Sequence, residues 1–282
     1  MNSFAYVRVI TIVMLAMALT GCIRFYPTTW GWYYNRPNID TVAAPDVDTA
    51  ALRRLYPNDA GVMLGTRIRA KEKLWERGED NYVVVRAHRY VILDPKADWL
   101  TNISETFHRS VKVVTADVMV FHPDGQREHY GLDDFTVTSS SEYARLYRLP
   151  IRNATAGTVV DMCFVLSSYS SMNFCEVEPI YMRYSIPSLG QEVYYTWPVW
   201  STFIDKKIPE DAGAVPTRSM TNDEVTYVVG PQPAAREEPF SPEQAVRWAR
   251  LDFCARPQFL YGYKSTGSFW SDHGRLMYSE YF

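Results

Sequence analysis

Residues 82–93, which decide the fold, read YVVVRAHRYVIL and place polar side chains at Arg86, His88 and Tyr90, two residues apart. Val, Ile and Tyr favour strands, and polar positions with a period of two are typical of a strand with one face in water. An Asp-Pro pair at 94–95 follows and ends the strand. We therefore expect a β-strand whose Arg86–His88–Tyr90 face is solvated.

The same strand signals recur along the chain. Residues 111–121 read VKVVTADVMVF, and the next four residues, HPDG, predict a turn because Pro presets φ and Gly supplies a positive φ. Further strands are expected at 126–130, 135–138, 143–149, 158–166, 174–186, 193–200 and 225–229, with Pro and Gly between them. A polar stretch with two prolines, 204–222, is expected to be a loop. Many short strands without intervening helices predict a mostly β protein, an antiparallel β-sandwich.

The C-terminal residues differ from this pattern. Ser241 followed by Pro242 is a helix-start signal, and it predicts a helix to about Ala255. Ser268 is placed to cap a last helix over 269–282. We therefore expect the β-sandwich to carry a short helical tail.

The composition favours a globular protein and gives no reason to expect nucleic acid as a partner. Hydrophobic residues make up 47% of the chain and charged residues 22%, which allows a sizeable core. The net charge is -3, and Lys and Arg are scattered along the chain. Nucleic-acid binding proteins concentrate positive charge on one face, so that class is not expected here.

The N-terminus has the layout of an export signal. Arg8 precedes an apolar run at 9–19, VITIVMLAMAL, which is too short to span a bilayer. Residues 19–22, LTGC, follow and resemble the lipobox of bacterial lipoproteins. The resemblance implies cleavage before Cys22, lipidation of Cys22 and a membrane-anchored protein in the bacterial cell envelope, with the outer membrane as the expected site. The alternative is an ordinary secretory signal in which Cys22 has no role.

These features divide the chain into four parts. A lipoprotein signal peptide is expected at 1–21, followed at 22–54 by an aromatic juxtamembrane segment and a flexible tether. The tether is inferred from PNIDTVAAPDVDTAA at 37–51, which is rich in Pro, Asp and Ala and has no periodicity. A single helical turn is expected at 52–56. The β-sandwich then occupies 55–235 and the helical tail 236–282.

The cysteines offer one candidate disulfide. Cys163 and Cys175 flank a polar break, SSYSS, between two apolar runs. If that break is a hairpin turn, the two cysteines face each other across the strands, and an exported protein permits a disulfide. Two buried thiols are the alternative, because free Cys packs as a small hydrophobe.

No set of residues in the sequence predicts catalysis, a metal or a cofactor. Cys254 is the candidate nucleophile, but the predicted helix places it mid-helix with no His beside it, so a structural role is expected. The five histidines lack metal-ligand spacing, although His122 and His129 flank one turn. We expect no metal and no cofactor.

Aromatic residues provide the most suggestive binding chemistry. Residues 194–200 read YYTWPVW, and a strand would place alternate rings on each face. Tyr195, Trp197 and Trp200 are therefore candidates for an aromatic binding surface on which a glycan could stack. The alternative is that these rings belong to the core or cover an edge.

Four stretches in order resemble a family. They are YPNDAGVML at 56–64, HRYVIL at 88–93, ADVMVFHPDG at 116–125, and the segment 149–161, which begins with LP and ends with GTVVD. This set resembles the bacterial domain of unknown function that lies N-terminal to transglutaminase-like domains in envelope proteins, and the resemblance covers roughly 55–235. It implies a β-sandwich. SFWSD at 268–272 resembles the start of the helix that leads into the enzyme domain in that family. The Cys, His and Asp of the transglutaminase-like site have no counterpart in this sequence, so no catalytic residue is carried over.

Three functional hypotheses follow. The first is a non-catalytic envelope lipoprotein whose β-sandwich binds or scaffolds a protein partner, such as a separate transglutaminase-like protein. The second is a glycan-binding surface lipoprotein. The third is a truncated transglutaminase-like enzyme that lacks its catalytic domain.

Overall fold

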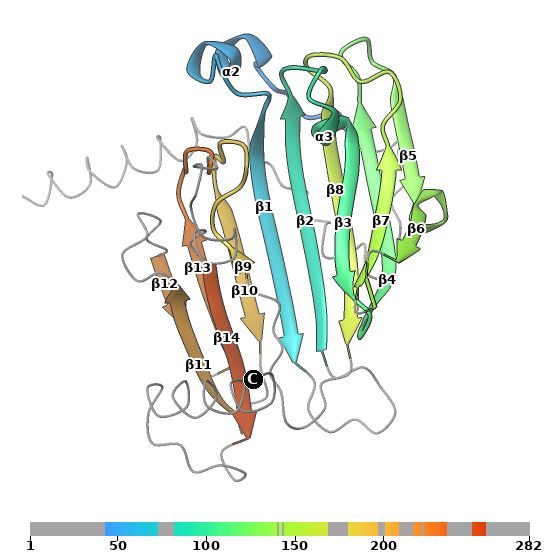
Figure 1. The fold of residues 1–282 in the computed structure, drawn as a ribbon. Coiled ribbons are helices and arrows are strands. Elements are labelled where there is room, and N and C mark those ends of the chain that lie inside the picture. Colours follow the sequence, from blue (N-terminus) through green and yellow to red (C-terminus); the bar gives the residue numbers. More distant parts are fainter. Residues whose placement is uncertain are drawn as a thin grey trace, which may run out of the picture.

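Most of the chain whose structure is described lies in β-strands (Figure 1). The computed structural model describes residues 43–72, 82–139, 141–142, 144–168, 180–196, 201–208, 217–221, 223–235 and 250–257. Among these residues, no helix has the length and the apolar character needed to cross a membrane. The predominance of strands among the described residues confirms the prediction of a mostly β protein.

The elements are listed here in chain order. They are α2 (Thr49–Leu55), β1 (Gly61–Glu72), β2 (Tyr82–Ile92), α3 (Asp98–Thr101), β3 (Asn102–His108), β4 (Val111–Phe121), β5 (Arg127–Gly131), a 3-10 helix η3 (Leu132–Asp134), β6 (Thr136–Ser139), β7 (Ala144–Pro150), β8 (Val159–Ser168), β9 (Ile180–Tyr181), β10 (Gln191–Thr196), β11 (Ser201–Ile208), β12 (Thr217–Met220), β13 (Glu224–Val229) and β14 (Arg250–Pro257).

A large sheet organises the described strands. Eight strands follow the order β12-β13-β10-β1-β2-β8-β4-β5, and two three-stranded sheets, β11-β14-β9 and β3-β7-β6, accompany it. The pairing of β1 with β10 is parallel, and the other pairs in the large sheet are antiparallel. The expectation of a purely antiparallel fold is therefore wrong at this pair. Parallel neighbours need a long crossover, and here β2 to β9 lie between β1 and β10 in sequence.

A β-bulge in β1 explains why the sequence pattern did not predict this strand. The pairing of β1 with β2 shifts between Met63 and Gly65. Before the shift, Val62 packs in the cluster on one face of the large sheet, and after it Ile68, an even-numbered residue too, packs in the cluster on the other face. An inserted residue reverses the alternation of side chains, so β1 shows no continuous period of two.

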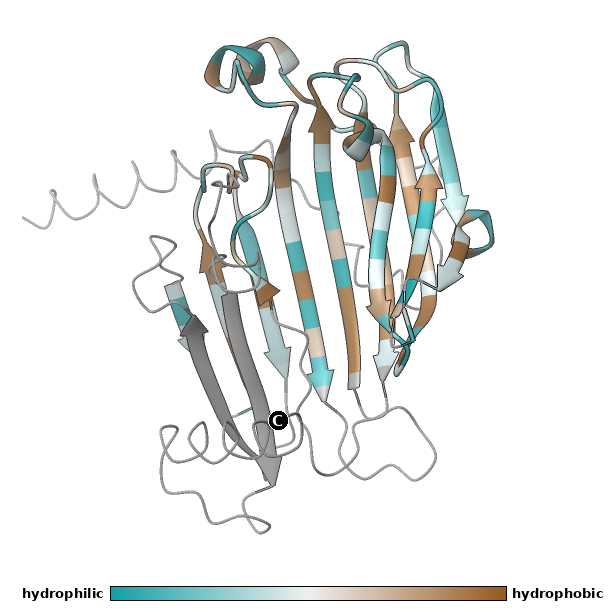
Figure 2. Ribbon diagram, in the orientation of Figure 1, coloured by the Kyte–Doolittle hydropathy of each residue, from teal (hydrophilic) through white to brown (hydrophobic). Residues whose placement is uncertain are grey.

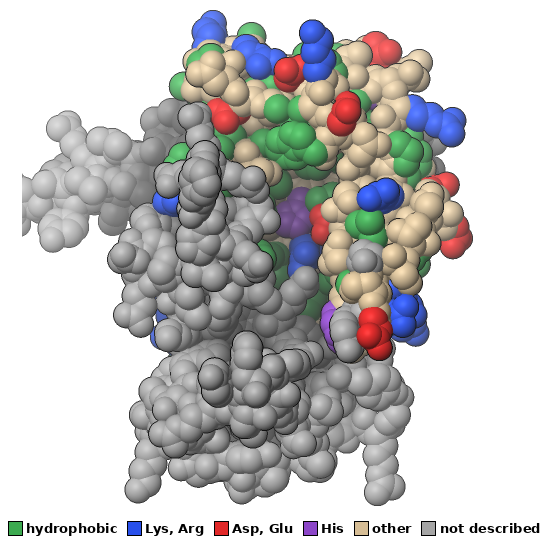
Figure 3. Space-filling model, in the orientation of Figure 1, with side chains coloured by type: hydrophobic (Ala, Val, Ile, Leu, Met, Phe, Trp, Pro, Cys, Tyr) green, Lys and Arg blue, Asp and Glu red, His purple; other side chains and the backbone are tan. Residues whose placement is uncertain are grey.

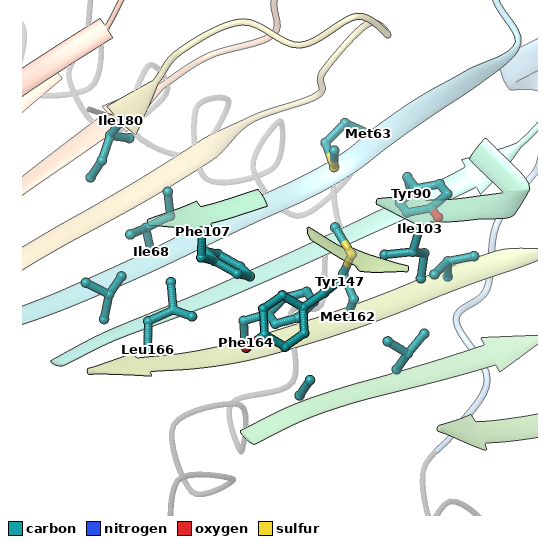
Figure 4. Packing of buried hydrophobic residues seen from close by; sticks show 14 of the residues in the cluster. Met63, Ile68, Tyr90, Ile103, Phe107, Tyr147, Met162, Phe164, Leu166 and Ile180 are labelled. Atoms are coloured by element: carbon teal, nitrogen blue, oxygen red, sulfur yellow. The ribbon is translucent and has the colours of Figure 1, made fainter. Parts of the chain in front are cut away.

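The sheet β3-β7-β6 packs on one face of the large sheet, which we call the front face (Figures 1 and 4). Phe107 of β3 lies 5.6 Å from both Tyr147 of β7 and Phe164 of β8, measured between ring centroids. Tyr90 of β2 donates a hydrogen bond to the Leu100 carbonyl at 3.0 Å. These contacts join the two layers through aromatic rings.

Residues 86, 88 and 90 lie on this front face, and their burial corrects the sequence analysis. His88 is 6% exposed and Tyr90 is 5% exposed, and the Arg86 side chain is 17% exposed. The face was expected to be solvated. The polar side chains instead lie beneath a second layer, which the alternation along one strand cannot reveal.

The opposite, back face of the large sheet carries a second hydrophobic cluster. Met119, Val165 and Leu93 belong to it, and Leu52 of α2 packs against it. Asp48 caps α2, because its carboxylate accepts a hydrogen bond from the Ala51 N–H at 2.8 Å. Apolar and polar bands are interspersed along β1 and β2, and both strands contribute residues to a hydrophobic cluster on each face of the sheet (Figure 2). The helical turn expected at 52–56 thus forms as part of α2.

Three strands overturn two expectations: β11 and β14 of the sheet β11-β14-β9, and β12 at the edge of the large sheet. Strand β11 occupies 201–208 and β12 occupies 217–220, where residues 204–222 were expected to be a loop. Strand β14 pairs antiparallel with β11 over Arg250–Pro257, where the predicted helix was to run to about Ala255. Strand pairing has overridden local helix propensity here. Residues 236–249 and 258–282 lie outside the described residues, as does the second predicted helix.

Candidate functional site

Five polar side chains meet on the front face over β1, β2 and β3. They are Thr66, Arg86, His88, Glu105 and Tyr184, which we call the His88 cluster. Thr66 and His88 are direct cross-strand partners, so their side chains lie on the same face. Glu105 comes from β3 of the second layer, and Tyr184 follows β9. The cluster therefore forms only when both layers assemble.

A chain of hydroxyl groups fixes His88. The Thr66 Oγ1 atom lies 3.1 Å from His88 Nδ1, and Tyr184 forms a side-chain hydrogen bond with Thr66. The rings of His88 and Tyr184 meet edge to face at 5.9 Å between centroids. Hydroxyl groups both donate and accept, so this chain can orient its protons in either direction. His88 Nε2 is accordingly a donor in one orientation and an acceptor in the other.

An ion pair borders the imidazole. Arg86 NH1 lies 3.9 Å from Glu105 Oε2, and the Arg86 guanidinium lies 5.9 Å from the centroid of the Phe107 ring. The side chains of Arg86 and Glu105 are 17% and 24% exposed, so the pair is partly accessible to solvent. Figure 3 shows a histidine at the bottom of a hollow on this face, beside hydrophobic and basic side chains.

Burial keeps two titratable groups of the cluster, His88 and Tyr184, uncharged at neutral pH. It lowers the pKa of His88 to about 3, and the Arg86 charge lowers it further in the same direction. Burial also raises the pKa of Tyr184 to about 12. At neutral pH the imidazole and the phenol are both neutral, and the Arg86–Glu105 pair supplies one charge of each sign.

A second polar group crosses the back face, and we call it the Arg89 row: Arg89, Asp117, His129, Asp161 and Cys163. Arg89 NH2 lies 2.5 Å from Asp161 Oδ2, and the two side chains are 3% and 1% exposed. Asp117 Oδ1 lies 3.2 Å from His129 Nε2. Strand register explains the row, because Arg89 is the cross-strand partner of Asp161 and Cys163 is that of Asp117.

The electrostatics of the Arg89 row indicate a structural role. Burial raises the pKa of Asp161, while the adjacent Arg89 guanidinium opposes that rise. Burial also raises the pKa of Cys163, and the neighbouring carboxylates of Asp161 and Asp117 raise it further. The Cys163 thiol is therefore protonated at neutral pH and unsuited to act as a nucleophile.

The candidate disulfide loses the geometry from which it was inferred. Cys163 is a buried free thiol in β8, and β8 pairs with β2 along one edge and with β4 along the other. Both edges are occupied, so no hairpin strand returns beside Cys163. Cys175 lies outside the described residues, and the disulfide itself stays a prediction.

The structure corrects the predictions for some of the other site residues, and the remaining site residues lie outside the part of the chain that it describes. Tyr195 has no exposed surface, so it belongs to the core and not to an aromatic binding surface. Trp197, Trp200 and the lipidation site Cys22 lie outside the described residues. Cys254 lies in strand β14 opposite Ile204, and not in a helix as expected.

The two histidines that flank the predicted turn point to opposite faces. His122 Nε2 lies 3.3 Å from Glu128 Oε1, whereas His129 faces Asp117 in the Arg89 row. Strands β4 and β5 pair here, so residues one position apart alternate between faces. Within the described residues, no group of three or more His, Cys, Asp or Glu side chains could hold a metal.

Sequence reasoning found part of the His88 cluster and missed the rest. Arg86 and His88 were placed on one strand face, but Thr66, Glu105 and Tyr184 had no local signal. Thr66 follows the bulge in β1, and Glu105 lies in a strand that the sequence pattern did not predict. Only the pairing of β1 with β2 and the packing of β3 bring them to His88.

These features define a mostly β protein with a mixed central sheet and a buried polar cluster on each face. No family model matches the sequence, and no curated protein matches it. Among solved structures, the chain is similar to a putative protease from Parabacteroides distasonis, with a TM-score of 0.54 and 10% identity. The match covers 69% of this chain and 40% of that one. The chain thus matches less than half of that longer protein, and the likeness concerns the fold.

Weaker likenesses extend to two further structures. An M1 zinc metallopeptidase from Deinococcus radiodurans has a TM-score of 0.31 and 9% identity, covering 68% of this chain and 42% of that one. Leukotriene A4 hydrolase from Saccharomyces cerevisiae has a TM-score of 0.36 and 10% identity, covering 81% and 33%.

Proposed function

We propose that this chain is a non-catalytic binding module of the bacterial envelope, anchored by a lipid on Cys22. Its partner is a protein, with a separately encoded transglutaminase-like protein as the candidate. In this proposal the described strands form a β-sandwich in which β3-β7-β6 supplies the second layer. The proposal joins the lipobox and family resemblances of the sequence to the chemistry of the described polar clusters.

One observation carries the non-catalytic part of this proposal: burial holds the chemically versatile side chains in their neutral forms. The pKa of His88 lies near 3 and that of Tyr184 near 12, and burial raises the pKa of Cys163. A general acid or base works best with a pKa near the operating pH, and a nucleophilic Cys needs a lowered one. These shifts run the other way, so they argue against proton transfer and nucleophilic attack by these groups.

The fold comparison supports a modular role. The putative protease from Parabacteroides distasonis shares this fold over 40% of its chain. A fold that occupies part of a longer protein is compatible with an accessory module that positions another domain. In the present chain, the proposed module carries out that task for a separate protein.

The test is capture from solubilised envelopes with the full chain as bait. We expect a transglutaminase-like polypeptide to be enriched, and to be captured equally by a Cys22→Ser bait added to the same extract. Equal capture would show that the folded part makes the contact and not shared membrane. Recovery of the bait alone would contradict the proposal.

The two other hypotheses are tested separately. The glycan-binding surface now depends on Trp197 and Trp200, since Tyr195 is buried. Loss of glycan binding on changing either Trp to Ala would support it. The truncated-enzyme hypothesis requires a Cys–His–Asp domain in the downstream reading frame.

A further inference from the structure

We propose that the His88 cluster is a binding site for a neutral saccharide. This site goes beyond the proposed function, which requires only a protein partner. It differs in position and residues from the aromatic surface expected at Tyr195, Trp197 and Trp200. The inference rests on backbone pairing, hydrogen-bonding capacity and charge balance at the cluster.

Backbone pairing determines how a ligand can be recognised here. Strand β1 pairs with β10 and β2, and β2 pairs with β1 and β8, so Thr66, Arg86 and His88 lie on strands with both edges occupied. A peptide that adds as an extra strand needs a free sheet edge. Recognition at the His88 cluster must therefore come from side chains, as is usual for small polar ligands.

The side chains of the cluster match the hydrogen bonding of sugar hydroxyls. Arg86 offers N–H donors and Glu105 offers carboxylate acceptors, and Arg86 NH1 lies 3.9 Å from Glu105 Oε2. The Tyr184–Thr66–His88 chain can present His88 Nε2 as donor or acceptor. A hydroxyl group donates and accepts at once, so a pair of vicinal hydroxyls can use the donor and the acceptor sides together.

The charge balance of the cluster selects a neutral ligand. Arg86 and Glu105 cancel, and His88 and Tyr184 are neutral at pH 7. A charged ligand would lose its hydration without meeting a net opposite charge, which is unfavourable. The half-buried Tyr184 ring adds an apolar surface for the C–H face of a sugar.

The experiment is titration calorimetry on the full chain in a detergent without a sugar headgroup. The probes are cellotetraose, maltotetraose and tetra-N-acetylchitotetraose as neutral saccharides, a tetragalacturonate as the charged saccharide and tetra-alanine as the peptide. We expect at least one neutral saccharide to bind about tenfold or more tightly than the charged saccharide and the peptide. Absence of binding by all three neutral probes would overturn the proposal, as would preference for the charged probe or the peptide.

Matched variants locate the site. Thr66→Val removes the hydroxyl from the Tyr184–Thr66–His88 hydrogen-bonded chain, and Glu105→Gln removes the negative charge of the acceptor. Each change is expected to weaken binding by about tenfold. The control is Glu192→Gln in the Arg67–Glu192 ion pair on the back face, where the two atoms are 2.7 Å apart. We expect that change to leave affinity within about twofold.

Two further measurements distinguish a lost saccharide site from a misfolded variant and from a failure of the proposed function. Thermal unfolding of each variant shows whether it is folded at the titration temperature. Equal loss of affinity in Glu192→Gln and Glu105→Gln would overturn the assignment of the site. Because partner capture is measured independently, a failed capture with intact saccharide binding would reject the proposed function and keep this site.

Discussion

At the residue scale, His88 links folding to pH. Its pKa is about 3 in the folded protein against 6.5 for an ordinary His, because burial and the Arg86 charge oppose protonation. Between these values the unfolded chain binds the extra proton, so stability rises with pH. The contribution of His88 is fully present above about pH 6.5 and is lost as pH falls toward 3.

Replacing His88 by Gln removes this dependence. We expect the free energy of unfolding of the original chain, relative to His88→Gln, to fall by about 1.4 kcal/mol per pH unit between pH 6 and pH 4. Urea unfolding at several pH values measures it. A constant difference between the original chain and His88→Gln would contradict the assignment.

The Arg89–Asp161 pair gives a second residue-scale prediction. Both side chains are almost fully buried, so Arg89→Met leaves an unpaired carboxylate in the core. We expect a loss of about 3–5 kcal/mol in the free energy of unfolding. The double change Arg89→Met and Asp161→Leu should recover most of it, because neither member of the pair is then left buried without its partner.

The control for this pair is again on the back face. Arg67→Met breaks the Arg67–Glu192 pair, whose side chains are 18% and 38% exposed. Its expected cost is about 0–1 kcal/mol. Chemical denaturation measures all three variants. An Arg89→Met variant no less stable than Arg67→Met would show that the buried pair has little effect on stability.

At the element scale, Phe164 of β8 joins the layers. Its ring lies 5.6 Å from that of Phe107 of β3, centroid to centroid (Figure 4). The corresponding distance to the Phe135 ring is 5.7 Å. Phe164→Ala is expected to cost about 3–5 kcal/mol, from lost burial and the cavity left behind. Val137→Ala on β6 should change stability by less than about 0.5 kcal/mol, because Val137 is 47% exposed. Urea midpoints compare the two, and similar midpoints would argue against this packing role.

Elements with a local signal were predictable, and those created by tertiary pairing were not. The strands at 82–92, 111–121 and 159–168 were predicted from β-branched residues and turn signals. Strand β1 was missed because its bulge interrupts the alternation, and β14 was given a helix because Ser241 and Pro242 form a helix-start signal. The parallel β1–β10 pair depends on a crossover of more than a hundred residues, which no local pattern records.

At the scale of the whole molecule, the candidate site is a product of the assembled layers. The sequence placed Arg86 and His88 on one strand face but assigned that face to solvent. Packing of β3 brings Glu105 over it, and the segment after β9 brings Tyr184. Burial under the second layer lowers the pKa of His88. Because the pattern along one strand does not reveal that second layer, the lowered pKa could not be predicted from the sequence.

The anchor is tested on the whole chain. The lipobox resemblance at LTGC, residues 19–22, implies that the lipid on Cys22 holds the protein in the membrane fraction. Since each buried CH₂ contributes about 0.8 kcal/mol, removing the acylated Cys should release the chain. We expect Cys22→Ser to move the protein from the membrane to the soluble fraction. Immunoblotting of the two fractions after ultracentrifugation measures this shift. Cys163→Ser is the matched control, because Cys163 is a buried thiol of β8, and it should remain in the membrane fraction. A Cys22→Ser protein that stays with the membrane would place the anchor elsewhere in the chain.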